Sequence, residues 1–137
     1  MTSWAAFEAA APEFGVAGRR LLAGSDGVPI AFLATVTRRG RPHLSPACPI
    51  FSGENLYLSA GAATPKVSDL RASSWYALHA FLADSDEEFQ VAGSALELNS
   101  EPERSRVHAD IKFGAFSKED PRAAPVSVVF EDHRVIQ

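Results

Sequence analysis

The chain places a lysine in the first turn of a predicted helix, directly after a loop of small residues. Residues 57–72 read YLSAGAATPKVSDLRA, which predicts a strand, a loop and the start of a short helix. Thr64 is a residue type that caps helices and Pro65 suits the first helical position, so the first-turn amides would face outward. Lys66 opposes the helix dipole, which makes sense if a phosphate or carboxylate binds there. The alternative is a solvent-facing lysine at an ordinary helix start.

Other arrangements that could support catalysis or metal binding are weak or missing from the sequence. No GxSxG, HExxH or GK[ST] phosphate-loop pattern occurs, so hydrolase and nucleoside-triphosphatase functions have no support. His108 and Asp110 are two residues apart, which does not put them on one face of a helix, and we expect no metal site. Cys48 alternates away from His43 on a regular strand, which favours an apolar filler over a nucleophilic pair.

Composition narrows the class of protein. With 137 residues the chain suits one domain, residues 1–137. Its formal charge of −4 makes nucleic acid a poor candidate partner. A single cysteine fits a reducing compartment, so we expect a cytoplasmic protein. No apolar run approaches the roughly 18 to 20 residues of a membrane helix, and we expect no membrane partner.

The hydrophobic periodicity predicts mostly strands, which must position the lysine. Helical spacing occurs in residues 1–24, and Ser100 with Glu103 forms a capping box for a helix over residues 100–112. Pro46 and Pro49 cannot donate to a ladder, so the strand that contains them should be bulged or lie at an edge. Strands are predicted at residues 30–37, 42–51, 55–60, 75–84 and 87–99, followed by a final hairpin over residues 126–137.

Six or seven strands with tight turns and short helices indicate a mainly β fold, a small antiparallel barrel with peripheral helices. Several strands are apolar on both faces, which requires that the outer face also be covered. So short a chain has few helices to do this. We therefore expect a homodimer whose sheets pack together.

Three segments in order, LATVTRRGRPHLSP, LYLSAGAATPKVSDLR and WYALHAF, make the chain resemble the pyridoxamine 5′-phosphate oxidase-like, FMN-binding split-barrel superfamily. The resemblance covers about residues 28–99, the expected barrel core. It implies a homodimeric split β-barrel. It also implies that FMN, or in some branches F420 or haem, binds in clefts at the subunit interface.

The resemblance also implies a set of cofactor-binding residues. Thr64, Pro65 and Lys66 correspond to the phosphate site, and Ser59 would line the same pocket. The strand that passes along the ring system and phosphate corresponds to His43, Leu44, Ser45, Pro46 and Ala47. His43 would stack on or hydrogen-bond to a cofactor ring, with a structural or surface histidine and a haem ligand as alternatives.

The sequence departs from the pyridoxamine phosphate oxidases themselves. An arginine and a lysine that frame the strand over residues 43–50 in those enzymes are missing, and Pro65 replaces an arginine beside the helix lysine. The C-terminal tryptophan and arginine of those enzymes are also missing, since this chain ends in HRVIQ. The resemblance therefore does not extend to true pyridoxamine phosphate oxidase activity.

These observations predict an FMN-binding oxidoreductase that acts on an unknown small molecule, with the cofactor supplying the chemistry. No catalytic side chain is assigned. The alternatives are an F420-dependent reductase, or a non-catalytic module that binds a cofactor or haem.

Overall fold

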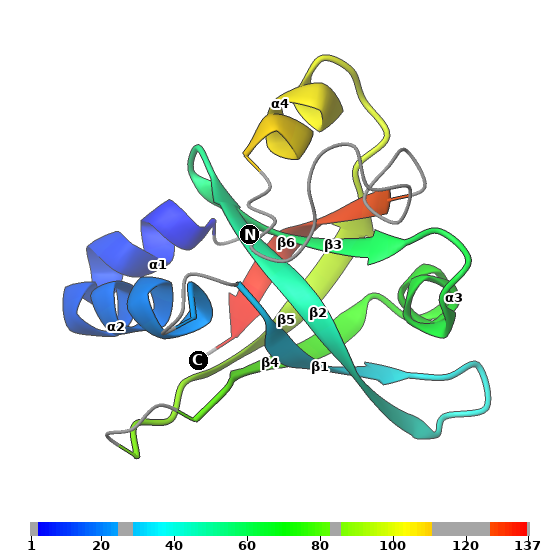
Figure 1. Ribbon diagram of the computed structural model, residues 1–137, viewed down its shortest axis with the longest axis horizontal. Helices are drawn as coiled ribbons and strands as arrows, with labels where there is room; N and C mark the ends of the chain where they lie inside the picture. The colour runs from blue at the N-terminus through cyan, green and yellow to red at the C-terminus, as the bar shows by residue number, and fades with distance from the viewer. Residues whose placement is uncertain (1–2, 25–28, 83–85, 111–126, 137) are drawn as a thin grey trace.

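The computed structural model describes residues 3–24, 29–82, 86–110 and 127–136. The fold is mainly β with short helices, as predicted (Figure 1). The helices are α1 (Trp4–Ala10), α2 (Pro12–Leu22), α3 (Pro65–Ala72) and α4 (Glu103–Ala109). The strands are β1 (Ala31–Val36), β2 (Pro42–Ser52), β3 (Asn55–Gly61), β4 (Trp75–Ala80), β5 (Gln90–Glu97) and β6 (Ser127–Ile136).

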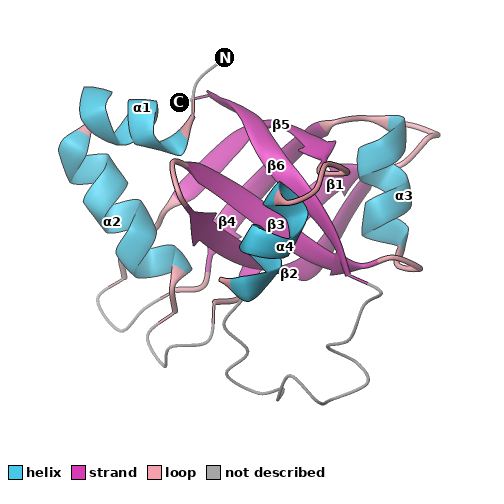
Figure 2. Cartoon of the chain, turned by 90° about the horizontal axis from the view of Figure 1, so that it is seen from above, coloured by secondary structure: helices cyan, strands magenta, loops and turns pink. Residues whose placement is uncertain are grey.

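The described strands close into an antiparallel barrel in the order β1-β2-β3-β6-β5-β4. Helices α1 and α2 lie on one side of this barrel and α3 lies on the opposite side (Figures 1 and 2). Leu33, Leu56, Leu58 and Leu78 are almost completely buried in its core. The predicted antiparallel barrel is therefore confirmed.

The predicted final hairpin over residues 126–137 is wrong, because β6 is one continuous strand. Its first half pairs with β3 and its second half pairs with β5, so β6 fills the gap between these strands. A turn in the middle would leave one of the two partners unpaired. The barrel therefore extends beyond residues 28–99, the range expected from the resemblance.

The prolines of β2 lie beside open sides of the strand, as expected, although β2 as a whole lies inside the closed sheet. Residues 42–47 of β2 pair with β1 on one side, and residues 48–52 pair with β3 on the other. Each half of β2 therefore has one free side, where alternate residues make no ladder bond. Pro46 and Pro49 fit such positions, and the carbonyl of Pro46 instead accepts a hydrogen bond from a side chain of α3.

The N-terminal helices and α4 differ in how well the sequence predicted them. Helices α1 and α2 lie within the predicted range of residues 1–24 and are separated at Ala11, just before Pro12. The helix expected over residues 100–112 is shorter, since α4 begins after Pro102 and ends at Ala109. Ser100 does donate a hydrogen bond to Glu103, at 3.2 Å, but Pro102 and not Ser100 occupies the N-cap position. Residues 111 and 112 lie outside the described part.

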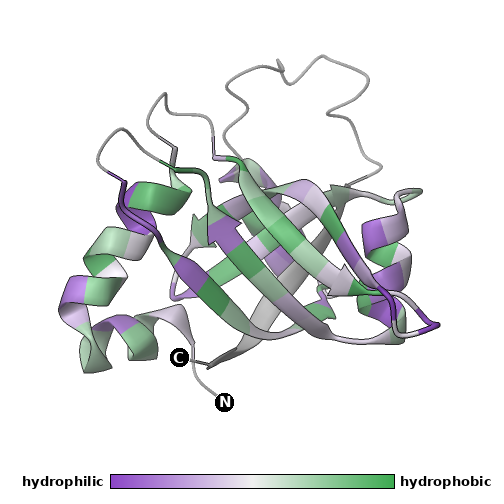
Figure 3. Cartoon of the chain, turned by 90° about the horizontal axis from the view of Figure 1, so that it is seen from below, coloured by the Kyte–Doolittle hydropathy of each residue, from purple (hydrophilic) through white to green (hydrophobic). Residues whose placement is uncertain are grey.

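The outer face of the barrel is covered only in part. Helix α4 covers the β2–β3 hairpin, where Ile50, Tyr57, Leu98 and Val107 form a second buried cluster. The outer faces of β1, β2 and β4 instead expose large hydrophobic side chains, and long hydrophobic stretches follow the strands in Figure 3. The exposed group, named here the apolar face, comprises Phe32, Val36, Leu44, Trp75 and Phe81. No helix in the described residues is long and apolar enough to cross a membrane.

Candidate functional site

Helix α3 lies beside the barrel at the end of the loop that follows β3. Val67 and Leu70 are three residues apart and fully buried, which fixes the helix face that packs on the barrel. Thr64 occupies the N-cap position and Pro65 the first helical position, as the sequence predicted. The Thr64 hydroxyl, however, donates to the carbonyl of Gly61 at 2.7 Å and caps no helix amide. The first turn of α3 therefore has no side-chain acceptor from Thr64.

Lys66 reaches from α3 to strand β2. Its Nζ donates to the carbonyl oxygen of Pro46 at 2.7 Å. Burial lowers the pKa of the Lys66 ammonium, and the nearby Cys48 thiol opposes that shift only in part. In the described residues no carboxylate forms an ion pair with Lys66. A half-buried ammonium without an anion beside it is the local condition that an anionic ligand would relieve.

One helical turn further along α3, Asp69 holds the side chain of His43. The Oδ2 atom of Asp69 lies 2.8 Å from His43 Nδ1 and accepts a hydrogen bond from Thr35 Oγ1 at the same distance. Asp69 and Thr35 are 6% and 2% exposed, whereas the His43 side chain is 30% exposed. The buried carboxylate therefore anchors an imidazole that is itself partly exposed.

Ser45 lies between these two contacts on β2, two residues after His43. Its hydroxyl oxygen is fully buried and has no hydrogen-bond partner within the described part of the chain. A buried hydroxyl without a partner is costly, and such groups in native proteins often mark a site completed by a ligand or water. The contact region between α3 and β2, named here the α3–β2 seam, thus contains a cation, an unpaired hydroxyl and an anchored imidazole.

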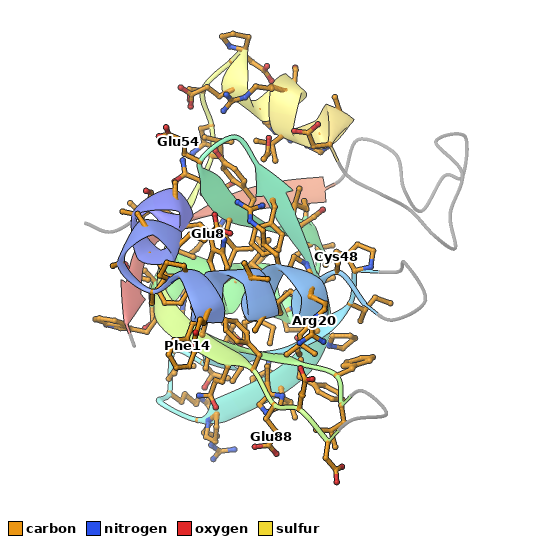
Figure 4. All side chains as sticks on the ribbon, turned by 90° about the vertical axis from the view of Figure 1, so that its left-hand side faces the viewer. Glu8, Phe14, Arg20, Cys48, Glu54 and Glu88 are labelled. Atoms are coloured by element: carbon orange, nitrogen blue, oxygen red, sulfur yellow. The ribbon has the colours of Figure 1, made fainter. Side chains whose placement is uncertain are left out.

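The structure brings together only some of the nine residues that the resemblance implies. His43, Ser45, Pro46 and Lys66 meet at the α3–β2 seam. Ser59 pairs with Cys48, the residue whose thiol interacts electrostatically with Lys66, and Figure 4 labels Cys48 on β2. The others lie apart from these contacts: Leu44 is 65% exposed on the apolar face, Ala47 is in the core, and Thr64 and Pro65 begin α3 without touching β2 through any recorded hydrogen bond.

Asp69 and Thr35 were not identified from the sequence. Asp69 follows Lys66 by three residues, so the two side chains share a helix face, and this spacing was the available sign. Thr35 is the polar residue at the end of an otherwise apolar strand. Nothing in the sequence indicates that these two side chains meet each other and His43, since Thr35 and Asp69 are 34 residues apart in the chain.

Burial also affects the single cysteine of the site. It raises the pKa of the Cys48 thiol, and Lys66 opposes this shift. The thiol is therefore neutral at ordinary pH and is not an activated nucleophile. Among the described residues no group of three histidine, cysteine or carboxylate side chains could hold a metal ion.

Comparisons with known proteins agree with this fold. A family model described as pyridoxamine 5′-phosphate oxidase matches residues 20–136. No curated protein matches the sequence. A haem storage protein from Vibrio cholerae is 14% identical with a TM-score of 0.66, over 93% of this chain and 90% of that one.

Two further solved structures are similar. An FMN-binding, pyridoxamine 5′-phosphate oxidase-related protein from Nostoc punctiforme is 16% identical with a TM-score of 0.64, over 92% of this chain and 78% of that one. A haem-binding protein from Mycobacterium smegmatis is 20% identical with a TM-score of 0.57, over 82% of this chain and 48% of that one. At these identities the structural likeness establishes the fold and leaves the ligand open.

Proposed function

This chain belongs to the pyridoxamine 5′-phosphate oxidase family, and from that premise we propose that it binds FMN and acts as an oxidoreductase on a small molecule. The observation that carries the proposal is Lys66, a half-buried ammonium with no carboxylate beside it in the described residues. Lys66 would hold the cofactor phosphate by a charge-assisted hydrogen bond. The Lys66 amide in the first turn of α3 would add one backbone donor, since Pro65 has no N–H and the Val67 amide donates to the Thr64 carbonyl.

The other residues of the α3–β2 seam fit the same ligand. The unpaired Ser45 hydroxyl offers a hydrogen bond that the protein itself does not use, and the partly exposed ring of His43 offers another. Bound FMN would supply the hydride transfer, while these side chains bind and orient it. No acid or base of the protein is assigned to the reaction.

The proposed substrate is not pyridoxamine 5′-phosphate. The basic residues that frame the corresponding strand in those oxidases are missing from residues 43–50, and Pro65 stands where they have an arginine. Fewer cations favour a substrate with less negative charge than a second phosphate ester.

We also propose a homodimer that packs through the apolar face. Phe32, Trp75 and Phe81 are 44%, 47% and 43% exposed, and the rings of Phe32 and Phe81 lie 4.5 Å apart. A second copy of the same sheet would bury this group, because a two-fold interface uses the same patch on both subunits.

The single cysteine supports a reducing, cytoplasmic location, and the net charge of −4 argues against nucleic acid as a partner.

Two other ligands deserve the same test. F420 also presents a phosphate to Lys66 and is the nearest substitute for FMN. Haem binding without catalysis is the second candidate, favoured by the partly exposed ring of His43 and by the haem-related names of two similar structures. A metal-ligating histidine typically donates its other ring N–H to a carboxylate, as His43 can to Asp69.

A side-by-side titration of the purified protein with FMN, F420 and haem tests the proposal. Cofactor fluorescence and the visible spectrum report binding of each. We expect FMN to bind with near one molecule per subunit, and Lys66→Ala to weaken it by about 1.5 to 3 kcal/mol through loss of a charged hydrogen bond. Binding of haem alone would select the non-catalytic module instead.

A further inference from the structure

The Asp69 carboxylate determines which nitrogen of His43 holds the proton. Oδ2 of Asp69 accepts a hydrogen bond from the Thr35 hydroxyl and lies against His43 Nδ1, each at 2.8 Å. An ionised carboxylate only accepts hydrogen bonds, so the hydrogen of the His43 contact lies on Nδ1. Thr35 Oγ1 lies 3.4 Å from the same nitrogen and already donates to Asp69, so it leaves this assignment unchanged.

The neutral His43 ring therefore has its lone pair on Nε2. Nδ1 faces a carboxylate whose side chain is only 9% exposed, while the His43 side chain as a whole is 30% exposed. No described residue forms a hydrogen bond with Nε2. The seam thus presents a fixed, unused acceptor.

This acceptor and the Lys66 ammonium meet β2 at different residues. Lys66 contacts the backbone at Pro46, three residues after His43, and three residues of extended strand span about 10 Å along the backbone. The two groups match a ligand that has an anion at one end and a hydrogen-bond donor farther along. Ser45 lies between them on the strand, with its own unpaired hydroxyl.

We propose that His43 Nε2 accepts a hydrogen bond from a hydroxyl or ring N–H of the bound flavin, and that Asp69 with Thr35 positions it for this contact. The inference rests on the proposed FMN function and adds a second recognition point to the one at Lys66. Asp69 and Thr35 touch no ligand and act only through His43. A flavin meets the requirement because its ribityl chain supplies hydroxyl donors next to the phosphate.

A comparison of FMN with riboflavin tests the contact at Lys66 and the contact at His43 independently. Riboflavin has the ribityl hydroxyls and the ring but no phosphate, so its binding is independent of the anion contact. The informative variant is His43→Asn, since the asparagine amide can still donate to Asp69 but has no acceptor at the Nε2 position. We expect His43→Asn to weaken FMN and riboflavin alike, each by about tenfold. The matched control, Lys66→Met, should weaken FMN alone.

A spectroscopic measurement tests the positioning role of Asp69 without any ligand. At about pH 8.5 a histidine is ordinarily neutral, and the ¹⁵N shifts of its ring nitrogens identify the protonated one. We expect the Nδ1–H form of His43 in the wild-type protein. Asp69→Asn should lose this preference, because the amide can donate to Nδ1 as well as accept from it.

The outcomes separate the inference from the proposed function. If wild-type protein binds neither flavin, the FMN function fails and the inference fails with it. If FMN and riboflavin bind but His43→Asn leaves both affinities unchanged, only the inference is overturned. An Nε2–H form of His43 in the wild-type protein overturns it too, as does haem binding whose Soret shift disappears in His43→Asn, since Nε2 would then ligate iron.

Discussion

Lys66 is held in an environment that disfavours its charge. Burial lowers the pKa of its ammonium, and the partner recorded for Nζ is a neutral carbonyl, that of Pro46. A neutral acceptor offsets less of the desolvation cost than a carboxylate would. An anion bound beside Lys66 would therefore offset a desolvation cost that the free protein carries.

The first prediction at this scale concerns pH. An anion binds the charged form of Lys66, and the pKa of this lysine lies below the ordinary value of 10.5. The ratio of FMN to riboflavin affinity should therefore fall as the pH rises through the lowered pKa, earlier than for an exposed lysine. Titrations between about pH 8 and 10 measure it. A ratio independent of pH, or one that still falls in Lys66→Met, would rule out Lys66 as the phosphate contact.

The same lowered pKa makes the folded protein more stable as the pH rises, whereas it makes FMN binding weaker. Because the folded pKa is lowered, the unfolded chain binds more protons between the two pKa values, and the free energy of unfolding rises with pH across that window. Charge on Lys66 thus favours the ligand and opposes the free fold. In the Lys66→Met variant this contribution to the pH dependence of unfolding should disappear.

Two serines of β2 give the second prediction. Ser45 has an unpaired buried hydroxyl, whereas the Ser52 hydroxyl donates to Asp110 at 2.5 Å. Ser45→Ala should leave the free energy of unfolding unchanged or raise it by about 1 kcal/mol, while FMN affinity falls about tenfold. Ser52→Ala should lower stability by about 1 to 2 kcal/mol and spare FMN binding. Chemical denaturation measures stability, and equal losses of stability in the two variants would contradict the assignment of Ser45.

The sequence indicated single site residues better than their contacts. Lys66 stood out because its charge conflicts with its place in a helix, and His43 because the resemblance included it. Asp69 and Thr35 looked like ordinary helix and strand residues, since their role depends on a contact across 26 and 8 residues of chain with His43. Such a contact depends on how α3 docks against the barrel, which local patterns do not specify.

At the scale of elements, α1 and α2 pack closely because Gly15 of α2 lies against Glu8 of α1 and Gly18 lies against Trp4 and Phe89. Trp4 of α1 is fully buried and contacts the rings of Phe7, Phe51 and Phe89. Arg19 of α2 pairs with Glu8 of α1 and lies 4.7 Å from the centre of the Phe51 ring. Figure 4 views the molecule from this side and labels Glu8. These contacts bring both helices onto the end of the barrel opposite α3.

Gly18→Ala tests this packing. A Cβ atom at Gly18 would lie 2.5 Å from Phe89 Cζ and 2.7 Å from Trp4 Cη2, and both rings are held in the core. We expect a loss of stability of about 1 to 3 kcal/mol from overpacking, despite the better helix propensity of alanine. Val16→Ala is the control, because Val16 is 67% exposed on the same helix. Thermal unfolding of the two variants should differ clearly, and equal melting temperatures would show that α2 can shift without cost.

Strand positions were predicted from the alternation of residues, but the roles of two strands were not. Pro46 and Pro49 suggested an edge, and a closed barrel instead accommodates them because β2 changes partners midway. A hairpin was predicted over residues 126–137, whereas residues 127–136 form one strand that pairs with both β3 and β5. Pairing in a barrel is a property of the closed sheet, so single-strand patterns cannot supply it.

At the scale of the whole molecule, the apolar face remains to be explained. Helices α1, α2 and α4 each cover part of the barrel. The outer faces of β1 and β4 still expose large side chains, among them Phe32 and Trp75. Phe32, Trp75 and Phe81 are each more than 40% exposed, and exposed groups of large apolar side chains often mark an interaction surface. A second subunit is the occupant that we propose.

Phe32→Glu tests the dimer. The charge would lie on the central strand β1 and, in a symmetric interface, would be introduced in both subunits. We expect the wild-type protein to have the mass of a dimer at micromolar concentration by light scattering, and Phe32→Glu to have that of a monomer. Val16→Glu, on exposed α2, should remain dimeric. A monomeric wild-type protein would contradict the interface.

The most direct test of the account is the affinity of FMN relative to riboflavin, measured in the wild-type protein and in Lys66→Met. If the α3–β2 seam binds the cofactor phosphate, the wild-type protein binds FMN about tenfold to a hundredfold more tightly than riboflavin, as expected for one charged hydrogen bond. The Lys66→Met variant should bind both flavins with nearly equal affinity. Equal affinities in the wild-type protein, or a preference for FMN that persists without Lys66, would contradict the central claim.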